Sequence, residues 1–360
     1  MLKIGIVGLA QVGKTTLFRA LTHAHGTGLG SGRPEAHVGI VHVPDPRLDR
    51  LAAIVHPQRK VYASVEYVDT PGSVIDLART GAQTAALREM DVLAHVVRVF
   101  EDKAVPHPSG TVEPRRDIEN VELELVLSDL GSVEKRLERL DKDLKKQKSP
   151  ALEKEHHVLG LCKQALEKQT PLREVSLAPE DERMIRGFTF LSSKPMLYAL
   201  NLGERDAAKT DAVEQFAAEV GLKQRPKTAA TAVCGKIEAE LAELNDEEAT
   251  EFLASYGLKE SALARVVRSS YHLLGMISFF TTDGGECRAW TIRAGTTAVE
   301  AAGEVHTDLQ RGFIRAEVVR FEDLSSAGGM AEARHQGTVK IEGKEYVLQD
   351  GEVVHFRHSA

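Results

Sequence analysis

The chain has 360 residues, of which 42% are hydrophobic and 28% are charged, proportions that are ordinary for a folded protein of two or three domains. The net charge of −7 argues against a general binder of polyanions, and three scattered cysteines form neither a disulfide framework nor a paired metal site. No apolar run approaches the ~20 residues that span a bilayer, and no signal peptide precedes the first strand pattern, so we expect a cytoplasmic protein with no membrane partner.

The amino-terminal part alternates short apolar strand patterns with helical segments. A helix begins near Lys14 after a glycine-rich turn, and the Gly/Ser-rich stretch at 26–32 is predicted to be a loop. The alternation predicts a doubly wound α/β domain with a mostly parallel sheet. The predicted strands are 3–8, 38–43, 61–68, 92–99 and 195–200.

The middle of the chain is predicted to form a helical hairpin. After Leu125 the apolar residues recur in alternating steps of three and four, which is a heptad seam, and charged residues flank it. Ser149 and Pro150 interrupt the first helix, expected at 118–147, and a second helical pattern follows at 151–168. We expect an antiparallel coiled-coil arm inserted into the α/β domain.

The last part of the chain has a different pattern of predicted elements. Short strand patterns at 278–281, 287–292, 314–320, 338–341 and 345–347, with one helix at about 298–309, predict a small α+β module. The expected domains are therefore a nucleotide-binding domain at 1–116 and 189–276, the arm at 117–188 and the α+β module at 277–360.

The turn after the first strand matches the P-loop pattern GxxxxGK[ST], with a strand before it and a helix after it. Its backbone N–H groups and the helix amino terminus are suited to hold phosphate. Lys14 is expected to reach the β- and γ-phosphates and to act in catalysis, and Thr15 to place its hydroxyl on Mg²⁺. The nucleotide-binding residues expected here are Gly8, Ala10, Gln11, Val12, Gly13, Lys14, Thr15 and Thr16.

A second phosphate motif, Asp69-Thr70-Pro71-Gly72, directly follows the predicted strand that ends at Val68. A carboxylate at the carboxyl end of a strand, opposite a P-loop, is the Walker B arrangement. We expect Asp69 to bind Mg²⁺ through water and the N–H of Gly72 to sense the γ-phosphate.

A third motif, Asn201-Leu202-Gly203-Glu204, follows another strand, at the place where GTPases of this class carry NKxD. The Asp of NKxD accepts hydrogen bonds from guanine N1–H and the 2-amino group, and adenine offers neither. Glu204 stands in place of that Asp, and its longer side chain shifts the position of the carboxylate acceptor. Leu202 presents an apolar surface to the base. Asn201 can bind a purine N7 or hold the P-loop backbone. The motif favours ATP over GTP.

Over nearly its whole length, the sequence resembles the YchF/Obg-like ATPase family of translation-factor-class P-loop NTPases. The resemblance implies a G domain with an inserted coiled coil, a C-terminal β-grasp-like TGS domain, ATP hydrolysis and ribosome binding. RNA contact would run through the basic arm and the TGS domain. The stretches that carry the resemblance are 43–48, 95–100, 201–204, 279–281, 288–291, 306–308, 312–317, 343–346 and 349–351.

The chain departs from this family at both γ-phosphate sensors. Arg33 stands where the family has the Thr of its first switch, and Ser73 stands where the family has an apolar residue. His107 matches the family's His that is proposed to orient the attacking water. The resemblance therefore implies a divergent member with slow hydrolysis.

The favoured interpretation is a slow, Mg²⁺-dependent ATPase that acts as a ribosome-associated switch. Lys14, Thr15, Asp69 and His107 support it. A nucleotide-binding adaptor that no longer hydrolyses is the alternative, and a conventional GTPase is the third interpretation. No oligomeric state is predicted.

Overall fold

The structure, a computed structural model, describes residues 1–22, 37–70, 73–74, 81–207, 213–219, 222, 225–258, 260–283 and 285–359. The chain forms two compact units, one of Met1–Val41 with Glu66–Leu273 and the other of His42–Val65 with Leu274–Ala360. The loop predicted at 26–32 lies outside the described residues. No helix in the described ranges is long and apolar enough to cross a membrane.

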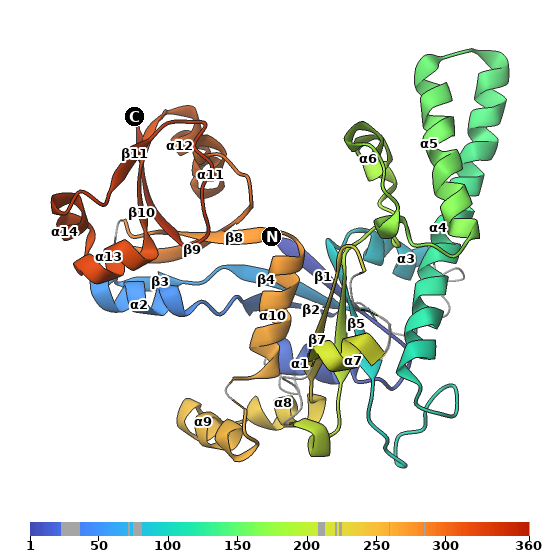
Figure 1. Cartoon of the computed structure of the whole chain (residues 1–360), viewed down its shortest axis with the longest axis horizontal. Coiled ribbons are helices and arrows are strands. Elements are labelled where there is room, and N and C mark those ends of the chain that lie inside the picture. Colours follow the sequence, from blue (N-terminus) through green and yellow to red (C-terminus); the bar gives the residue numbers. More distant parts are fainter. Residues whose placement is uncertain are drawn as a thin grey trace. The chain divides into compact units, whose positions relative to one another are not determined.

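The first unit is built on a six-stranded sheet (Figure 1). Its central strands are parallel, with Ile4 opposite Val92 and Leu93 opposite Met196. The mostly parallel sheet confirms the predicted α/β fold, and its buried strands are the apolar runs of the sequence. The strands, in spatial order, are β2 (His37–His42), β4 (Ser64–Asp69), β1 (Leu2–Val7), β5 (Val92–Arg98), β6 (Met196–Asn201) and β7 (Thr228–Val233).

Most helices of this unit lie between its strands in sequence, and α8, α9 and α10 follow the last strand, β7. The buried face of α1 carries Leu17, Phe18 and Leu21, as the sequence predicts. The helices are α1 (Lys14–Thr22), α3 (Gly81–Arg88), α4 (Pro114–Lys146), α5 (Pro150–Glu167), α6 (Pro179–Ile185), α7 (Val213–Glu219), α8 (Gly235–Leu241), α9 (Asp246–Ser255) and α10 (Ala262–Leu273), with short 3-10 helices η2 (Leu172–Glu174) and η3 (Arg186–Phe188).

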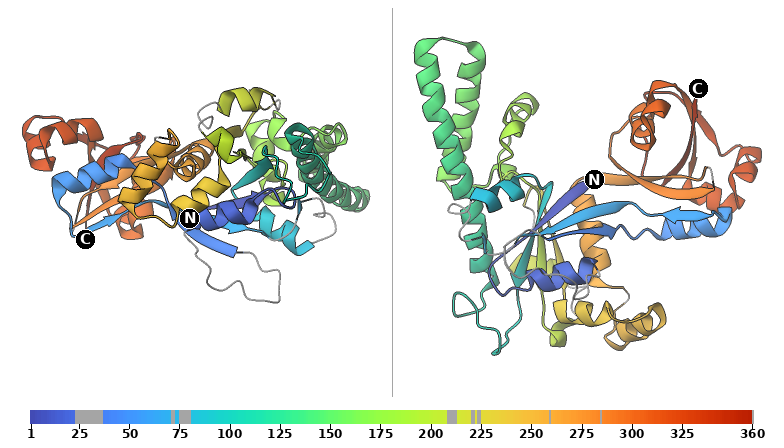
Figure 2. Two further views of the ribbon diagram at one scale, coloured as in Figure 1. Left: turned by 90° about the horizontal axis from the view of Figure 1, so that it is seen from below. Right: turned by 180° about the vertical axis from the view of Figure 1, so that it is seen from behind.

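Helices α4 and α5 form the predicted antiparallel hairpin, which both views of Figure 2 show side by side. Its seam buries Val133 and Leu140 of α4 against Val158 and Cys162 of α5. Helix α4 begins at Pro114, a favourable first helical position, so it starts a turn earlier than predicted. Its 33 residues correspond to about 50 Å at 1.5 Å per residue.

The second unit contains the predicted α+β module around a second six-stranded sheet. Its core packs Phe279, Phe313 and Phe356 against Ala298 and Ala302 of one helix. The strands, in spatial order, are β11 (Lys340–Glu342), β10 (Phe313–Arg320), β12 (Glu352–His358), β8 (Met276–Thr281), β9 (Glu286–Arg293) and β3 (Arg59–Val61); the helices are α2 (Pro46–Val55), α11 (Ala298–Val305), α12 (Thr307–Arg311), α13 (Phe321–Ala327) and α14 (Met330–His335).

The prediction of a single strand at 61–68 is wrong. This stretch contains the end of β3 and most of β4, which belong to different sheets. β3 pairs with β9 in parallel, and Arg47 binds Asp350 at 2.7 Å. Residues 42–65, which the sequence analysis placed in the nucleotide-binding domain, therefore group with the C-terminal residues.

Two predictions in the C-terminal region also differ from the structure. The helix expected at 298–309 is divided at His306, whose side chain accepts a hydrogen bond from the N–H of Asp308. Residues 345–347 form no strand beyond one isolated bridge at Val347, and the last strand is β12, which the sequence analysis missed. Side-chain capping and long-range pairing decide both points, and neither is visible in local hydrophobicity.

Candidate functional site

The P-loop connects β1 to α1, and its backbone requires glycine at two positions. Gly8 has φ 146° and Gly13 has φ 100°, values that side chains disfavour. A Cβ atom at Gly8 would lie 2.6 Å from the carbonyl oxygen of Val96, so no larger residue fits there. The predicted strand, glycine-rich loop and helix are therefore present in the order that a phosphate-binding loop needs.

The other predicted nucleotide-binding residues of this loop differ in burial and in whether they line the adjoining cavity. Val12 is buried, so its side chain shapes the loop. Ala10 is exposed, and Gln11 and Thr16 line the adjoining cavity. Gln11 has a φ of 59°, which is in the left-handed region.

Lys14 lies with its ammonium group against the inner side of the loop. Nζ donates to the carbonyl oxygens of Gly8 at 3.2 Å and of Leu9 at 2.6 Å. Burial lowers the pKa of Lys14, and the negative charge of Asp69 opposes this effect. The charge of Lys14 thus faces the region that the P-loop encloses, which is where a nucleotide's phosphates bind in this class of protein.

Thr15 and Asp69 come together from two elements that are distant in sequence. Thr15 Oγ1 donates to Asp69 Oδ2 at 3.0 Å, although the residues are 54 positions apart. Asp69 ends β4 and is buried, and burial raises the pKa of its carboxyl group despite the Thr15 hydrogen bond. The predicted hydroxyl–carboxylate pair is thus assembled beside the P-loop.

The chemistry of this pair fits Mg²⁺. Asp69 Oδ1 is buried and has no hydrogen-bond partner within the described residues. A carboxylate oxygen without a partner, next to a threonine hydroxyl, matches the hard oxygen ligands of Mg²⁺. The described residues contain no cluster of three or more metal-binding side chains, so phosphate and water would complete the coordination. Two of the predicted γ-phosphate sensor positions, Gly72 and Arg33, lie outside the described residues.

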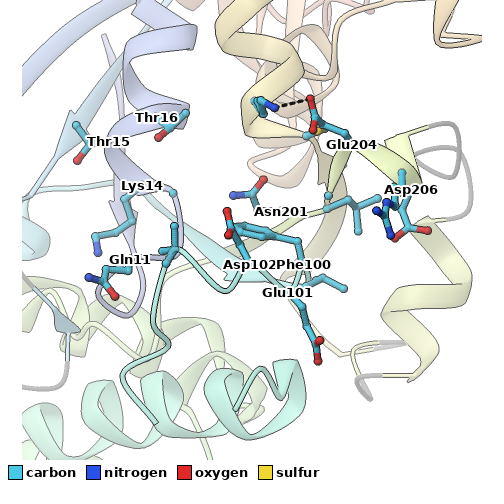
Figure 3. A pocket seen from close by; sticks show the side chains of 18 residues that line it. Gln11, Lys14, Thr15, Thr16, Phe100, Glu101, Asp102, Asn201, Glu204 and Asp206 are labelled. Carbon is cyan, nitrogen blue, oxygen red and sulfur yellow. Dashed lines mark ion pairs between the residues drawn. The ribbon is translucent and has the colours of Figure 1, made fainter. Parts of the chain in front are cut away.

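A cavity of about 1020 Å³ extends from the P-loop past the ends of β5 and β6 (Figure 3). Ligands of open α/β sheets bind at the carboxyl ends of parallel strands, and this cavity occupies that place. Its walls combine P-loop residues with polar and apolar side chains of three other loops. They are Gln11, Gly13, Lys14, Thr15, Thr16, Val99, Phe100, Glu101, Asp102, Val105, Asn201, Leu202, Gly203, Glu204, Arg205, Asp206, Cys234 and Lys236.

Asn201 links the P-loop to the start of α8. Its Nδ2 donates to the carbonyl oxygen of Val12 at 2.9 Å, and its Oδ1 accepts from the N–H of Gly235 at 3.0 Å. Figure 3 shows Asn201 between Lys14 and Glu204. Of the two roles that the sequence left open, the structure shows the one in which Asn201 holds the P-loop backbone.

Leu202 and Glu204 continue the cavity wall beyond Asn201. Leu202 is almost completely buried, whereas Glu204 forms an ion pair with Lys236 at 2.8 Å. Sequence reasoning missed Lys236. The available signal was its place just after β7, because neighbouring parallel strands end at the same edge of the sheet.

The loop after β5 forms another wall of the cavity, and Arg98 stabilises the conformation of this loop. The Arg98 guanidinium donates to the carbonyl oxygens of Phe100 at 3.0 Å and Val105 at 2.9 Å. It also lies over the Phe100 ring, 4.6 Å from the centroid. Sequence reasoning treated Arg98 only as part of a family signature, although a charged residue in an otherwise apolar strand was a visible signal.

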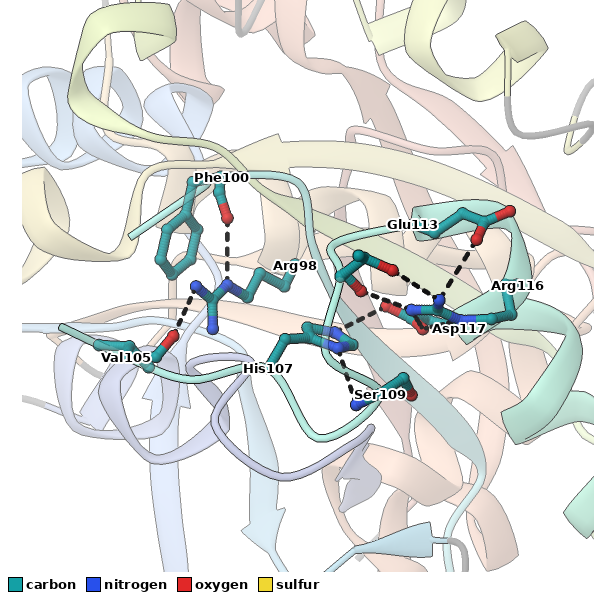
Figure 4. A network of polar contacts seen from close by, with 9 residues as sticks. Arg98, Phe100, Val105, His107, Ser109, Glu113, Arg116 and Asp117 are labelled. Carbon is teal, nitrogen blue, oxygen red and sulfur yellow. Dashed lines mark hydrogen bonds and ion pairs between the residues drawn. The ribbon is translucent and has the colours of Figure 1, made fainter. Parts of the chain in front are cut away.

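His107 lies further along the same loop, but it does not line the cavity. Figure 4 shows His107 beside Asp117. Its Nε2 is 2.9 Å from Oδ2 of Asp117, in the first turn of α4, and both side chains are 2% exposed. The two atoms are close but not aligned as a hydrogen bond. The N–H of Ser109 donates to Nδ1 at 3.2 Å, which leaves Nε2 to carry the proton.

Two family models match this chain. Residues 3–163 match MMR_HSR1, described as a 50S ribosome-binding GTPase, and residues 276–359 match YchF-GTPase_C, described as a protein of unknown function (DUF933). Together the models cover the start of the nucleotide site and nearly all of the C-terminal module.

Whole-chain relatives are also similar. The ribosome-binding ATPase YchF of Bacillus subtilis is 42% identical over 364 residues, covering 99% of each chain. The protein of that name from Escherichia coli O157:H7 is 41% identical over 363 residues, covering 98% of each. The solved structure of the YchF GTPase of Schizosaccharomyces pombe matches with a TM-score of 0.83 and 29% identity, over 99% of this chain and 97% of that one.

Proposed function

The chain belongs to the YchF family, and we propose that it binds Mg²⁺-ATP, hydrolyses it slowly and acts as a ribosome-associated molecular switch. The observation that carries this proposal is the convergence of Lys14, Thr15 and Asp69 at one end of a nucleotide-sized cavity. Such a role places the protein in the cytoplasm, as the sequence predicts.

The phosphates would lie along the P-loop. Its backbone N–H groups and the amino end of α1 supply partial positive charge, and Lys14 supplies a full charge that can move from the loop carbonyls to the β- and γ-phosphates. Phosphoryl transfer requires mainly positioning and charge neutralisation, so these groups account for most of the catalytic chemistry proposed here.

Thr15 and Asp69 would hold Mg²⁺, Thr15 through its hydroxyl and Asp69 through water. Bound Mg²⁺ supplies charge that neutralises the β- and γ-phosphates. The buried carboxylate of Asp69 has an oxygen without a hydrogen-bond partner in the described part of the chain, and this oxygen is available to a cation or its bound water.

The base would lie deeper in the cavity, where Leu202 and the Phe100 ring offer apolar surfaces. Asn201 remains occupied with the backbone, so it does not need to read the base. Glu204 reaches further than the Asp of NKxD and is paired with Lys236, and both features disfavour guanine. ATP is therefore the proposed substrate, with GTP second.

His107 would take part in hydrolysis only after it leaves Asp117. Its present position, outside the cavity, favours the adaptor alternative for this conformation of the loop. Single-turnover hydrolysis at saturating Mg²⁺-ATP separates the two functions. Measurable release of phosphate supports the ATPase, whereas tight binding with no release supports the adaptor.

The ribosome is the proposed partner. Exposed lysines at the arm tip, Lys145, Lys146 and Lys148, are suited to RNA phosphates. In the C-terminal unit Arg315 is exposed, whereas Arg288 is bonded to Glu286. Arg293, Arg311 and Arg320 are also exposed, and RNA contact through them is part of the same proposal.

A further inference from the structure

Lys236 and Glu204 form an ion pair at the wall of the nucleotide cavity. The Nζ–Oε1 distance is 2.8 Å, and the side chains are 65% and 41% exposed. The two residues come from different segments, Glu204 from the loop after β6 and Lys236 from the first turn of α8. Figure 3 marks the pair with a dashed line at Glu204.

The neighbouring polar side chain, that of Asn201, already forms hydrogen bonds with backbone groups. Asn201 donates to the P-loop and accepts from the N–H of Gly235, which immediately precedes Lys236. Past Asn201, this side of the cavity has Leu202, which is apolar, and then Glu204. Arg205 and Asp206 also line this side of the cavity. Of the motif side chains Asn201, Leu202 and Glu204, we assign the reading of the base edge to Glu204.

The edges of the two purines differ in the groups that a carboxylate can bind. Guanine presents N1–H and a 2-amino group, which are both donors, whereas adenine presents an unprotonated N1 and no 2-amino group. A free carboxylate attracts guanine. A carboxylate neutralised by an ammonium group attracts it less, and the ammonium itself repels the guanine donors.

We propose that Lys236 is a specificity-determining residue, which withdraws the Glu204 carboxylate from guanine and so favours ATP over GTP. The inference rests on the nucleotide-binding function proposed above. Because exposed ion pairs are weak, Lys236 contributes about a threefold to fivefold factor to the preference. Its effect is confined to the choice of base, since the phosphates bind at the other end of the cavity, along the P-loop.

The test measures dissociation constants of the full chain for Mg²⁺-ATP, Mg²⁺-GTP and Mg²⁺-ITP by calorimetry. Lys236→Met keeps most of the side-chain length but removes the charge, and it should shift the GTP-to-ATP affinity ratio toward GTP by about threefold to fivefold. Lys236→Arg can restore the ion pair and should keep the wild-type ratio. ITP lacks the 2-amino group, so its gain should be smaller than that of GTP.

Two further variants isolate the ion pair. Lys227→Met breaks a comparably exposed pair with Glu182, at 3.5 Å and remote from the cavity lining, and it should leave the ratio unchanged. In a Glu204→Gln background, Lys236→Met should no longer move the ratio, because the carboxylate that Lys236 restrains is gone.

The outcomes separate the two levels of the proposal. A wild-type chain that prefers ATP, with an unchanged ratio in Lys236→Met, overturns the role of Lys236 and leaves the proposed function standing. A shift of equal size in the Glu204→Gln background overturns the ion-pair mechanism. A wild-type chain that binds neither nucleotide, or prefers GTP, overturns the proposed function and the inference with it.

Discussion

Nε2 of His107 lies 2.9 Å from Oδ2 of Asp117, and this contact joins the loop after β5 to the first turn of the long arm helix α4. The same loop forms a wall of the nucleotide cavity at Phe100 and Val105. One short segment therefore touches both the proposed catalytic site and the base of the arm.

We predict that His107→Ala lowers single-turnover hydrolysis at least tenfold while changing ATP affinity less than twofold. This split is the signature of an interaction made only in the transition state. The measurement compares phosphate release with calorimetric binding. His156→Ala, which removes a histidine paired with Asp141 on the exposed face of the arm, is the matched control. Equal turnover in the His107 variant and the wild type would exclude His107 from the reaction.

Lys14→Ala should weaken binding of Mg²⁺-ATP by about 100-fold or more, since the ammonium group is the main full charge aimed at the phosphates. The fold should survive, because among the described residues Nζ donates only to two carbonyl oxygens of its own loop. Calorimetry measures the affinity, and circular dichroism during heating measures stability. An unchanged affinity would show that the phosphates bind elsewhere.

Asp69→Asn should stabilise the nucleotide-free chain by about 1 kcal/mol, or about 2–4 °C, because it removes a buried charge, one oxygen of which has no hydrogen-bond partner among the described residues. Burial raises the pKa of Asp69 in the folded state, so the cost of its charge is absent below the unfolded pKa and develops as pH rises through the folded pKa. The stability gain should therefore be larger at pH 7 than at pH 4.

The same substitution should have the opposite effect on ligand binding. A neutral amide binds a hydrated Mg²⁺ less well than a carboxylate does, so the Mg²⁺ dependence of ATP binding should shift to higher concentration. Thermal unfolding at the two pH values and titrations with Mg²⁺ at constant ATP measure both effects. A variant less stable than the wild type at pH 7 would contradict the prediction.

Charge reversal at the arm tip should weaken association with ribosomes. Replacing Lys145, Lys146 and Lys148 by Glu removes exposed positive charge, and the remaining binding should depend less steeply on salt. Co-sedimentation at rising salt, with an ATP analogue, with ADP or without nucleotide, measures it. The control makes the same change at Lys103, Lys135 and Lys168, which are exposed elsewhere. An absence of association at low salt in every nucleotide state would refute the ribosome proposal.

The sequence was sufficient wherever a short pattern carries its own geometry. The P-loop needs glycine at positions 8 and 13 because of their backbone angles, and these requirements appear directly as a motif. The heptad pattern likewise predicts the arm, since the 3.5-residue period of a coiled coil is a local property of the sequence. The approximate positions of the central strands follow from continuous apolar runs.

Contacts between distant segments were decided only by the tertiary structure. The β3 pattern resembles any edge strand, and only its pairing with β9 places it in the C-terminal sheet. The ion pair of Glu204 with Lys236 joins the loop after β6 to the start of α8, and the two segments meet because β6 and β7 are parallel neighbours. His107 was recognised as a candidate, but its burial against Asp117 depends on how the loop folds back onto α4. Local propensity determines which elements form, whereas the partner of a side chain depends on the whole packed arrangement.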